Sequence, residues 1–245
     1  MFESAQWVML DSVPSTNTYA QTLVAEKMLP EGSVIIANFQ EQGRGQRGNS
    51  WESRTGENLL MSTVLYPSFL PAARLFYISK VVALGVYSLV KGLGAEKVSI
   101  KWPNDIYIAD RKVAGILIEN TFRSTEIALS VVGTGININQ TEFNEAQKAT
   151  SLKLECGRVF ELKATAEELL RHLAFWYEHL RKNQFAAIDV AYHEKIYRLK
   201  MPSVYRENNL MFSGTITGVN EGGKLLIEKE TGETIAYDLK EVEFL

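Results

Sequence analysis

The residues with the clearest chemical potential lie in the segment 101–115, which begins with the sequence Lys-Trp-Pro-Asn-Asp. Pro103 removes a backbone donor and favours an extended conformation of the residue before it, so the chain is expected to leave its strand and expose Asn104 and Asp105 in a turn. Two short β-prone runs then predict a hairpin whose return strand begins near Lys112. An ammonium group beside a carboxylate and an amide indicates a site that handles anions.

The segment 43–48, Gly-Arg-Gly-Gln-Arg-Gly, is the second candidate. Its glycines let backbone N–H groups turn inward, and the guanidinium groups of Arg44 and Arg47 can grip a phosphate or a carboxylate in a fork. It lacks the lysine and hydroxyl of a phosphate-binding loop and the spacing of a dinucleotide fingerprint. Trp51 could wall off a ligand, although a tryptophan beside a strand is more often core. A solvated surface loop is the alternative interpretation.

The other polar signals favour structural roles. Lys101 is expected to end a strand with its ammonium group in water. His172, His179 and His193 lack the spacing of a helical metal pair and are predicted to be solvated or capping residues. Cys156 is the single cysteine, which excludes an internal disulfide framework and a cysteine-rich metal site and fits a small buried hydrophobe in a reducing compartment.

Length and charge narrow the class of protein. The chain has 245 residues, a formal net charge of −3 and a pI near 5.8, so any anion binding must come from a local cluster of cations. The N-terminus lacks the basic flank of a signal peptide, and the longest apolar run, 81–90, is short and bracketed by lysines. These features predict a soluble cytoplasmic protein that is not inserted in a membrane.

Hydrophobic periodicity predicts an α+β fold with a mixed or antiparallel sheet and helices. Expected strands are 7–13, 33–39, 59–66, 98–101, 113–122 and 126–138, and expected helices begin at Ser15 or Thr16, at Pro71 and at Thr165, the last ending near Ile196. After Pro202, short β-runs broken by turn signals predict a small β-barrel.

Several separated motifs, in this order, resemble the biotin protein ligase family. The motifs are Ser15-Thr16-Asn17, Gln40 with Gly43 to Gly48 and Trp51, Lys101 to Asp105, Arg111 to Leu117, and Gly133 to Asn137. The resemblance implies a class II synthetase-like biotin/lipoate ligase catalytic domain over residues 1–198 and an SH3-like β-barrel over 199–245. It also implies the short form without an N-terminal DNA-binding domain, since only residues 1–14 precede the first motif.

The family's activity supplies the implied chemistry. Biotin and ATP, with Mg²⁺ accompanying the nucleotide and no protein-bound metal, would give biotinyl-5'-AMP, and biotin would then pass to a lysine of a biotin carboxyl carrier domain of acetyl-CoA carboxylase or a related carboxylase. Attack of a carboxylate on an α-phosphate brings two anions together, so a positioned ammonium group can stabilise the transition state. A glycine-rich loop that orders over the adenylate would exclude water.

The resemblance assigns site residues individually. Biotin would be held by Ser15, Thr16, Asn17, Gln40, Gly43, Arg44, Gly45, Gln46, Lys112 and Gly115. ATP and the adenylate would be held by Arg44, Arg47, Trp51, Asn104, Asp105, Lys112 and Asn137. Lys112, Asp105 and Arg47 would act in catalysis. Gln46 departs from the pattern, because many relatives have an arginine there, and this puts tight retention of the adenylate in question.

Two other functions stay open at this level. A lipoate ligase or octanoyl transferase could use the same architecture, although a transferase needs a cysteine in the acyl site. A non-catalytic biotin or nucleotide sensor could keep the pocket and lose the chemistry. Binding to DNA is not expected, the carrier is not identified by any residue, and an exposed strand edge leaves both a monomer and a homodimer open.

Overall fold

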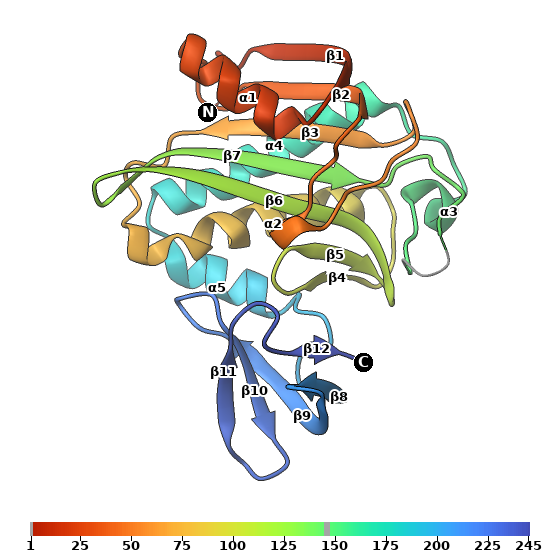
Figure 1. Cartoon of the computed structure of the whole chain (residues 1–245), viewed down its shortest axis with the longest axis vertical. Helices are drawn as coiled ribbons and strands as arrows, with labels where there is room; N and C mark the ends of the chain where they lie inside the picture. Colours follow the sequence, from red (N-terminus) through yellow and green to blue (C-terminus); the bar gives the residue numbers. More distant parts are fainter. Residues whose placement is uncertain (1, 145–147) are drawn as a thin grey trace.

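The computed structural model describes residues 2–144 and 148–245 and is built on a seven-stranded sheet in the order β1-β2-β3-β7-β6-β5-β4 (Figure 1). The strands are β1 (Trp7–Val13), β2 (Val34–Gln40), β3 (Leu59–Leu65), β4 (Val98–Lys101), β5 (Asp105–Ile108), β6 (Arg111–Arg123) and β7 (Glu126–Ile136). β1 and β2 run parallel, and the other neighbours are antiparallel. The predicted α+β fold with a mixed sheet is therefore confirmed.

Helices cover both faces of this sheet. They are α1 (Thr16–Glu26), α2 (Phe76–Gly92), α3 (Leu152–Cys156), α4 (Leu162–Arg181) and α5 (Phe185–His193), with short 3₁₀ turns at Gln46–Gly48 and Ala72–Arg74. In Figure 1, α1 lies in front of the sheet, whereas α2, α4 and α5 form a layer behind it.

The two faces follow from alternation along the strands. On β2, Val34 and Ile36 pack in the core behind the sheet, while Ile35 packs in a smaller cluster with Ala20 of α1. On β3, Val64 joins the same front cluster. The front cluster is small, so most of the remaining front face is free to form a site.

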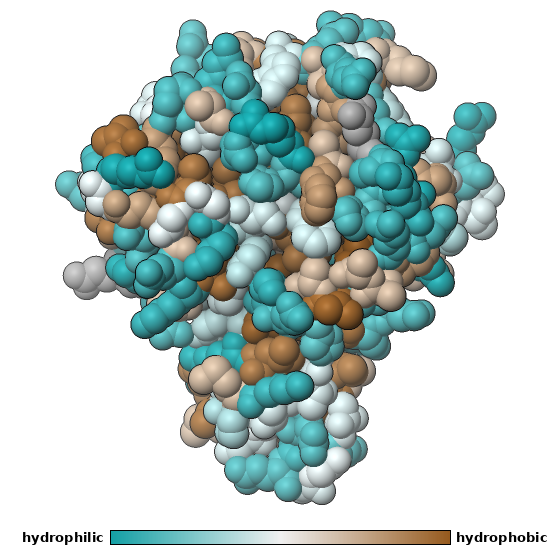
Figure 2. Space-filling model, turned by 180° about the vertical axis from the view of Figure 1, so that it is seen from behind, coloured by the Kyte–Doolittle hydropathy of each residue, from teal (hydrophilic) through white to brown (hydrophobic). Residues whose placement is uncertain are grey.

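Helix α2 is the longest apolar segment. Residues Ala72–Gly92 are long and apolar enough to cross a membrane, but most of this segment is buried within the protein. The helix packs against α4 and α5, and Gly85 allows Leu173 of α4 to approach closely, since a Cβ at Gly85 would lie 2.7 Å from a Leu173 methyl group. Figure 2 shows the outer surface on this side as a mixture of hydrophilic and hydrophobic residues. The apolar character of α2 is therefore that of a core helix.

The C-terminal part forms a five-stranded antiparallel sheet in the order β11-β10-β9-β8-β12, as the sequence predicted for a small β unit. Its strands are β8 (Pro202–Glu207), β9 (Leu210–Val219), β10 (Leu225–Lys229), β11 (Thr234–Tyr237) and β12 (Glu243–Phe244). A division between residues 198 and 199 stays a prediction, and the first strand of this sheet begins at Pro202.

Buried contacts hold the small sheet against the large one. The indole Nε1 of Trp102 donates to the carbonyl of Gly223 at 2.8 Å, and Phe76 of α2 packs against the same glycine, where a Cβ would lie 2.4 Å from the ring. His193 places Nε2 2.8 Å from the carbonyl oxygen of Thr217 in β9. The expectation that His193 is solvated or capping was therefore wrong, because the small domain covers it.

The helical region also differs from the expectation in detail. The single helix predicted from Thr165 to about Ile196 is two helices, since the chain turns at Lys182 to Gln184 between α4 and α5. Helix α3 was not predicted. Ser15 does occupy the N-cap position of α1, but its side chain makes no capping hydrogen bond.

Replacing Trp102 with Phe tests the domain contact. Losing the indole N–H leaves the buried Gly223 carbonyl without its donor, so the free energy of unfolding is expected to fall by about 1–3 kcal/mol, measured by urea denaturation. Trp176→Phe is the matched control, because Trp176 Nε1 donates to Ser88 Oγ within the large domain at 3.2 Å. A Trp102 variant as stable as the wild type would contradict a docking role for this bond.

Candidate functional site

The principal cavity, about 630 Å³ in volume, crosses the front face of the large sheet. Its walls come from the start of α1, the loop after β2, the strands β3 to β7, the turn between β4 and β5, and the C-terminal segment before and within β12. In Figure 1 the loop after β2, drawn in orange, passes in front of β6 and β7. The cavity therefore extends from α1 at one end to the small domain at the other.

Three glycines on neighbouring strands make its floor. A Cβ at Gly133 would lie 2.6 Å from Asn17 Oδ1, and one at Gly135 would lie 2.5 Å from the indole of Trp51. A Cβ at Gly115 of β6 would lie 2.9 Å from the same indole. Contacts under 3.0 Å leave no room for a side chain, so these positions need glycine for packing. Trp51 accordingly lies within the cavity, as its predicted role requires.

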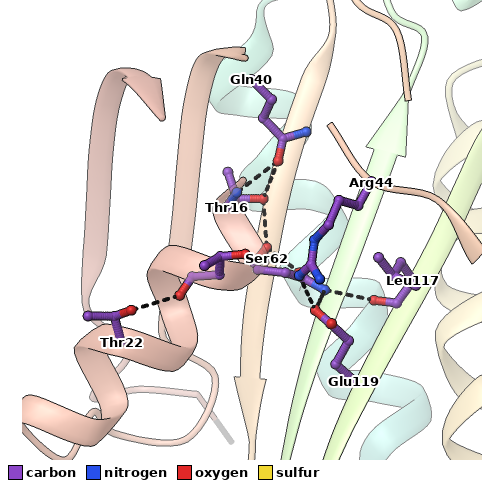
Figure 3. Close-up of polar contacts among 9 residues, drawn as sticks. Thr16, Thr22, Gln40, Arg44, Ser62, Leu117 and Glu119 are labelled. Atoms are coloured by element: carbon purple, nitrogen blue, oxygen red, sulfur yellow. Dashed lines mark hydrogen bonds and ion pairs between the residues drawn. The ribbon is translucent and has the colours of Figure 1, made fainter. Parts of the chain in front are cut away.

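The start of α1 forms a buried polar pocket at one end of the cavity (Figure 3). The backbone N–H and the hydroxyl of Thr16 donate to Gln40 Oε1 at 2.8 and 3.0 Å. Ser62 Oγ lies 2.7 Å from Thr16 Oγ1 and 2.6 Å from Asn17 Oδ1. Ser15, Thr16 and Asn17 are each no more than 4% exposed. Sequence analysis missed Ser62, which alternation on β3 directs to this face.

Glu119 links this pocket to the loop after β2. Its Oε2 accepts from Asn17 Nδ2 at 2.9 Å and from Arg44 Nη2 at 2.7 Å (Figure 3). Glu119 was also missed, although it follows Gly115 and Leu117 at the period-two spacing of β6. Arg44, a predicted ligand-binding residue, is therefore present at the cavity and held by a carboxylate.

Lys112 and Asp105 meet in the middle of the cavity, as expected. Lys112 Nζ lies 2.8 Å from Asp105 Oδ1, and the two atoms form an ion pair without the alignment of a directed hydrogen bond. The same ammonium group lies 5.4 Å from the centre of the Trp51 ring. Asn104 braces the turn, since its Nδ2 donates to the carbonyl of Ile116 at 2.9 Å. An ammonium group and a carboxylate therefore share one place above the glycine floor.

Lys101 does not lie in water, so that expectation was wrong. Its ammonium donates to the Tyr107 hydroxyl at 3.0 Å and lies 4.7 Å and 5.0 Å from the ring centres of Tyr107 and Phe244. Burial lowers the pKa of Lys101, and the nearby Asp105 carboxylate partly opposes this shift. Lys101 lines the cavity at the end next to the small domain.

The glycine-rich loop is closed by its own backbone. Trp51 N–H donates to the Gly43 carbonyl at 2.9 Å, and a Cβ at Gly43 would lie 2.3 Å from the Trp51 carbonyl oxygen. Gly45 and Gln46 line the cavity, whereas Gly43 serves this closure. The backbone of Arg47 lies in the 3₁₀ turn, and its side chain is outside the described residues.

The structure places Asn137 elsewhere. Asn137 is 4% exposed, and its amide Nδ2 donates to the Thr150 carbonyl at 3.0 Å. It is not among the described residues that line the principal cavity. This hydrogen bond holds the segment that follows β7 against the end of that strand. The assignment of Asn137 to the ATP site stays a prediction.

The small domain adds residues that the sequence did not indicate. Leu239, Lys240, Val242, Glu243 and Phe244 line the end of the cavity beside Lys101. No local pattern in a β-rich tail marks such residues, because their proximity comes from domain docking. The cavity is therefore a site between two domains as well as a sheet-face site.

A polar cavity on the face of a sheet is the architecture of a ligand-binding domain, and comparisons with known proteins identify its family. The model of the biotin/lipoate A/B protein ligase family matches residues 9–137. The bifunctional ligase/repressor BirA of Escherichia coli is 32% identical over 225 residues, which are 91% of this chain and 69% of that protein. The chain therefore belongs to the biotin/lipoate A/B protein ligase family.

Other similar proteins are biotin ligases by name. A biotin–[acetyl-CoA-carboxylase] ligase of Paracoccus denitrificans is 28% identical, with 93% of this chain and 96% of that protein covered. The structure of a biotin protein ligase from Aquifex aeolicus in complex with biotin and ATP matches with a TM-score of 0.81 and 26% identity, covering 98% of both chains. The resemblance stated from the motifs is confirmed.

Replacing Gly135 with Ala tests the glycine floor. The new methyl group would overlap the indole of Trp51, so this side chain is expected to move and the protein to lose about 1–3 kcal/mol of stability. With 5-fluorotryptophan incorporated, ¹⁹F NMR should show a shift of the Trp51 resonance, assigned with a Trp51→Phe variant. Gly92→Ala is the control, since nothing lies within 4 Å of a Cβ there. An unmoved Trp51 signal would contradict the packing described.

Proposed function

We propose that this protein is a biotin protein ligase, which activates biotin with ATP to biotinyl-5'-AMP and transfers biotin to a lysine of a carrier domain. The observation that carries the proposal is one continuous cavity with a buried hydrogen-bonding pocket at one end and the Lys112–Asp105 pair in its middle. The similarity to named biotin ligases over nearly the whole chain supports the same function.

The pocket at the start of α1 suits the ureido ring of biotin. That ring carries a carbonyl acceptor and two N–H donors, and buried partners of both kinds are needed to replace water. The hydroxyls of Thr16 and Ser62 and the amide groups of Asn17 and Gln40 supply both kinds within one network. A ligand anchored there would extend its valeryl chain past the Trp51 indole, which covers Gly115 and Gly135, toward Lys112.

The centre of the cavity suits the first half-reaction. A biotin carboxylate oxygen attacks the α-phosphorus, the bond from that phosphorus to the bridging oxygen breaks, and pyrophosphate leaves with the electron pair. Lys112 can reduce the repulsion between the two anions and stabilise the charge that develops on the phosphoryl oxygens. Asp105 keeps this ammonium group in place before the substrates arrive.

The loop after β2 would act as the cover of the adenylate. Gly43 and Trp51 close its base, and the ion pair of Arg44 with Glu119 ties it to the sheet. Ordering of such a loop over a mixed anhydride excludes water and slows hydrolysis. Gln46 Oε1 is buried without a hydrogen-bond partner among the described residues, so a ligand group can satisfy it.

Mg²⁺ and the carrier complete the proposal. Among the described residues no group of three His, Cys, Asp or Glu side chains could hold a metal, so we place Mg²⁺ on the phosphates of ATP, where this ion usually keeps water and substrate oxygens. The carrier would be a biotin carboxyl carrier domain of acetyl-CoA carboxylase or a related carboxylase. We place the reaction in the cytoplasm, in keeping with the free thiol of Cys156.

The rival acyl chemistries fit less well. An octanoyl chain offers no hydrogen bonds to the polar pocket at Thr16 and Ser62. An acyl transferase needs a nucleophile in the cavity, but Cys156 ends α3 and is not among the described lining residues of the cavity. Burial also raises the pKa of the Cys156 thiol, which disfavours the thiolate.

The test of the proposed function is to incubate the protein with ATP, Mg²⁺ and either biotin, lipoate or octanoate, and to identify the nucleotide products by mass spectrometry. Biotinyl-5'-AMP from biotin, with little adenylate from the other two acids, is the expected result. An adenylate formed mainly from lipoate or octanoate would transfer the function to the rival ligase. Biotin binding without any adenylate would indicate a sensor.

Replacing Lys112 with Ala should lower the rate of adenylate formation by about 10²–10³-fold, the usual effect of losing one preorganised charge stabiliser. The rate is measured as biotin-dependent exchange between pyrophosphate and ATP. Lys163→Ala, at an exposed position of α4, is the control and should leave the rate unchanged. A near-normal rate in the Lys112 variant would remove this residue from its proposed role.

A further inference from the structure

Lys112 faces the cavity, although regular alternation along β6 would turn it to the other side of the sheet. Gly115 and Leu117 line the cavity at every second position of this strand. Counting back from Gly115 at the same period would place Val113 on the cavity face and Lys112 on the opposite face. The structure shows the reverse, because Lys112 lines the cavity and Val113 is buried in the core behind the sheet.

A β-bulge in β6 causes this reversal. In the register of β6 against β5, Ala114 and Lys112 have partners on adjacent residues of β5, and Val113 between them is skipped. Val113 and Ala114 are both fully buried in the core behind the sheet. A bulge inserts one extra residue and re-aims the side chain beyond it. Lys112 is therefore directed to the front face, where a Cβ at Gly115 would lie 3.2 Å from its Nζ.

Beyond the end of β7, a later part of the chain lies beside the bulge. Residues 148–150, here called the return segment, run parallel to β6 and form a bridge with it at Lys112. The N–H of Lys112 donates to the carbonyl of Lys148 at 2.9 Å, and the carbonyl of Lys112 accepts from the N–H of Thr150 at 2.9 Å. The return segment therefore holds both backbone polar groups of the proposed catalytic lysine.

Thr150 anchors the return segment. It is fully buried, its hydroxyl donates to Glu155 Oε1 of α3, and its carbonyl accepts from Asn137 Nδ2 at 3.0 Å. The N–H of Asn137 donates to the carbonyl of Val113 at 2.8 Å, which ties the bulge to the same group of residues. Arg111, the first residue of β6, donates to the same Glu155 oxygen at 2.6 Å. None of these five is among the described residues that line the principal cavity.

We propose that Thr150 is a positioning residue for adenylate formation, because it anchors the return segment that holds the bulge and so aims Lys112 at the reacting groups. This role rests on the proposed ligase function. The ammonium group of Lys112 can stabilise the developing charge only from a fixed place beside the carboxylate and the α-phosphate. A displacement of about 1 Å can lower the rate by about 10²-fold. Thr150 thus acts through Lys112 from outside the cavity.

The first test is Thr150→Val in the full chain, which keeps the branched shape and removes the hydroxyl that bonds Glu155. The kcat of adenylate formation, measured by pyrophosphate–ATP exchange, should fall by about 10- to 100-fold. The KM for biotin should stay within about twofold, because the weakened interaction belongs to the transition state. Thr150→Ser keeps the hydroxyl and should retain a kcat within about threefold of the wild type.

Thr165→Val is the matched control. Thr165 is 4% exposed, and its hydroxyl donates to the carbonyl of Glu161 at the start of α4 at 2.7 Å, so this variant also loses a buried hydroxyl but leaves the return segment intact. Its kcat should equal that of the wild type. If Thr150→Val does not fold, Glu155→Ala takes its place, since it removes the acceptor of the Thr150 hydroxyl from a half-buried position and should lower kcat in the same way.

A double mutant separates positioning from a general effect on the fold. Since Thr150 acts through Lys112, adding Thr150→Val to Lys112→Ala should change the remaining rate by less than about twofold. A loss as large as the one that Thr150→Val causes alone would show that Thr150 acts on another part of the protein. That result would overturn the proposal.

Hydrogen exchange of backbone amides tests the return segment without turnover. In Thr150→Val the Lys112 amide, followed by NMR, should exchange about 10-fold faster, whereas the amides of β3 should keep their rates. Unchanged exchange at Lys112, or an unchanged kcat, would overturn the proposal. A wild-type protein that forms no biotinyl-5'-AMP would refute the proposed function, and faster exchange at Lys112 in the variant would still support the hold of the return segment on the bulge.

Discussion

The site depends on the close approach of the Asn17 and Trp51 side chains to a part of the sheet surface that is made of glycines. Asn17 and Trp51 lie where side chains of Gly133 and Gly135 would otherwise be, and Trp51 also covers Gly115. This packing brings the start of α1 and the loop after β2 onto β6 and β7, which follow much later in the chain. The cavity that results lies between these two elements and the sheet, and the glycines of its floor are covered by the Asn17 and Trp51 side chains.

The segment 101–105 serves structure and chemistry together. The indole N–H of Trp102 donates to the Gly223 carbonyl of the small domain, and Lys101, Trp102 and Asp105 all line the cavity. Docking of the small domain therefore fixes the same turn that presents the charged groups. The wall that includes Phe244 comes from the docked small domain, so this domain contributes directly to the cavity on the large sheet.

Much of this arrangement could be predicted from the sequence, because periodicity gave the strands and separated motifs gave the positions of Thr16, Trp51 and Lys112. Other features depend on tertiary contacts that no local pattern reveals. From the sequence alone, Lys101 is expected at an exposed strand end, and only the structure shows that Phe244 of the small domain covers it. Glu119 is likewise expected to be an ordinary strand carboxylate, and only the structure shows its ion pair with Arg44. The position of the Lys112–Asp105 ion pair could be predicted from the sequence. The outer wall of the cavity, which the small domain supplies, could not.

The most direct measurement follows an isotope through the complete reaction. Biotin labelled with ¹⁸O in its carboxylate is incubated with ATP, Mg²⁺ and a biotin carboxyl carrier domain, and the AMP released is analysed by mass spectrometry. Attack of the carboxylate on the α-phosphate requires that one labelled oxygen appear in AMP, and the account predicts this result. AMP without label, formed while the carrier gains biotin, would contradict the central claim that the two anions react with each other in this cavity.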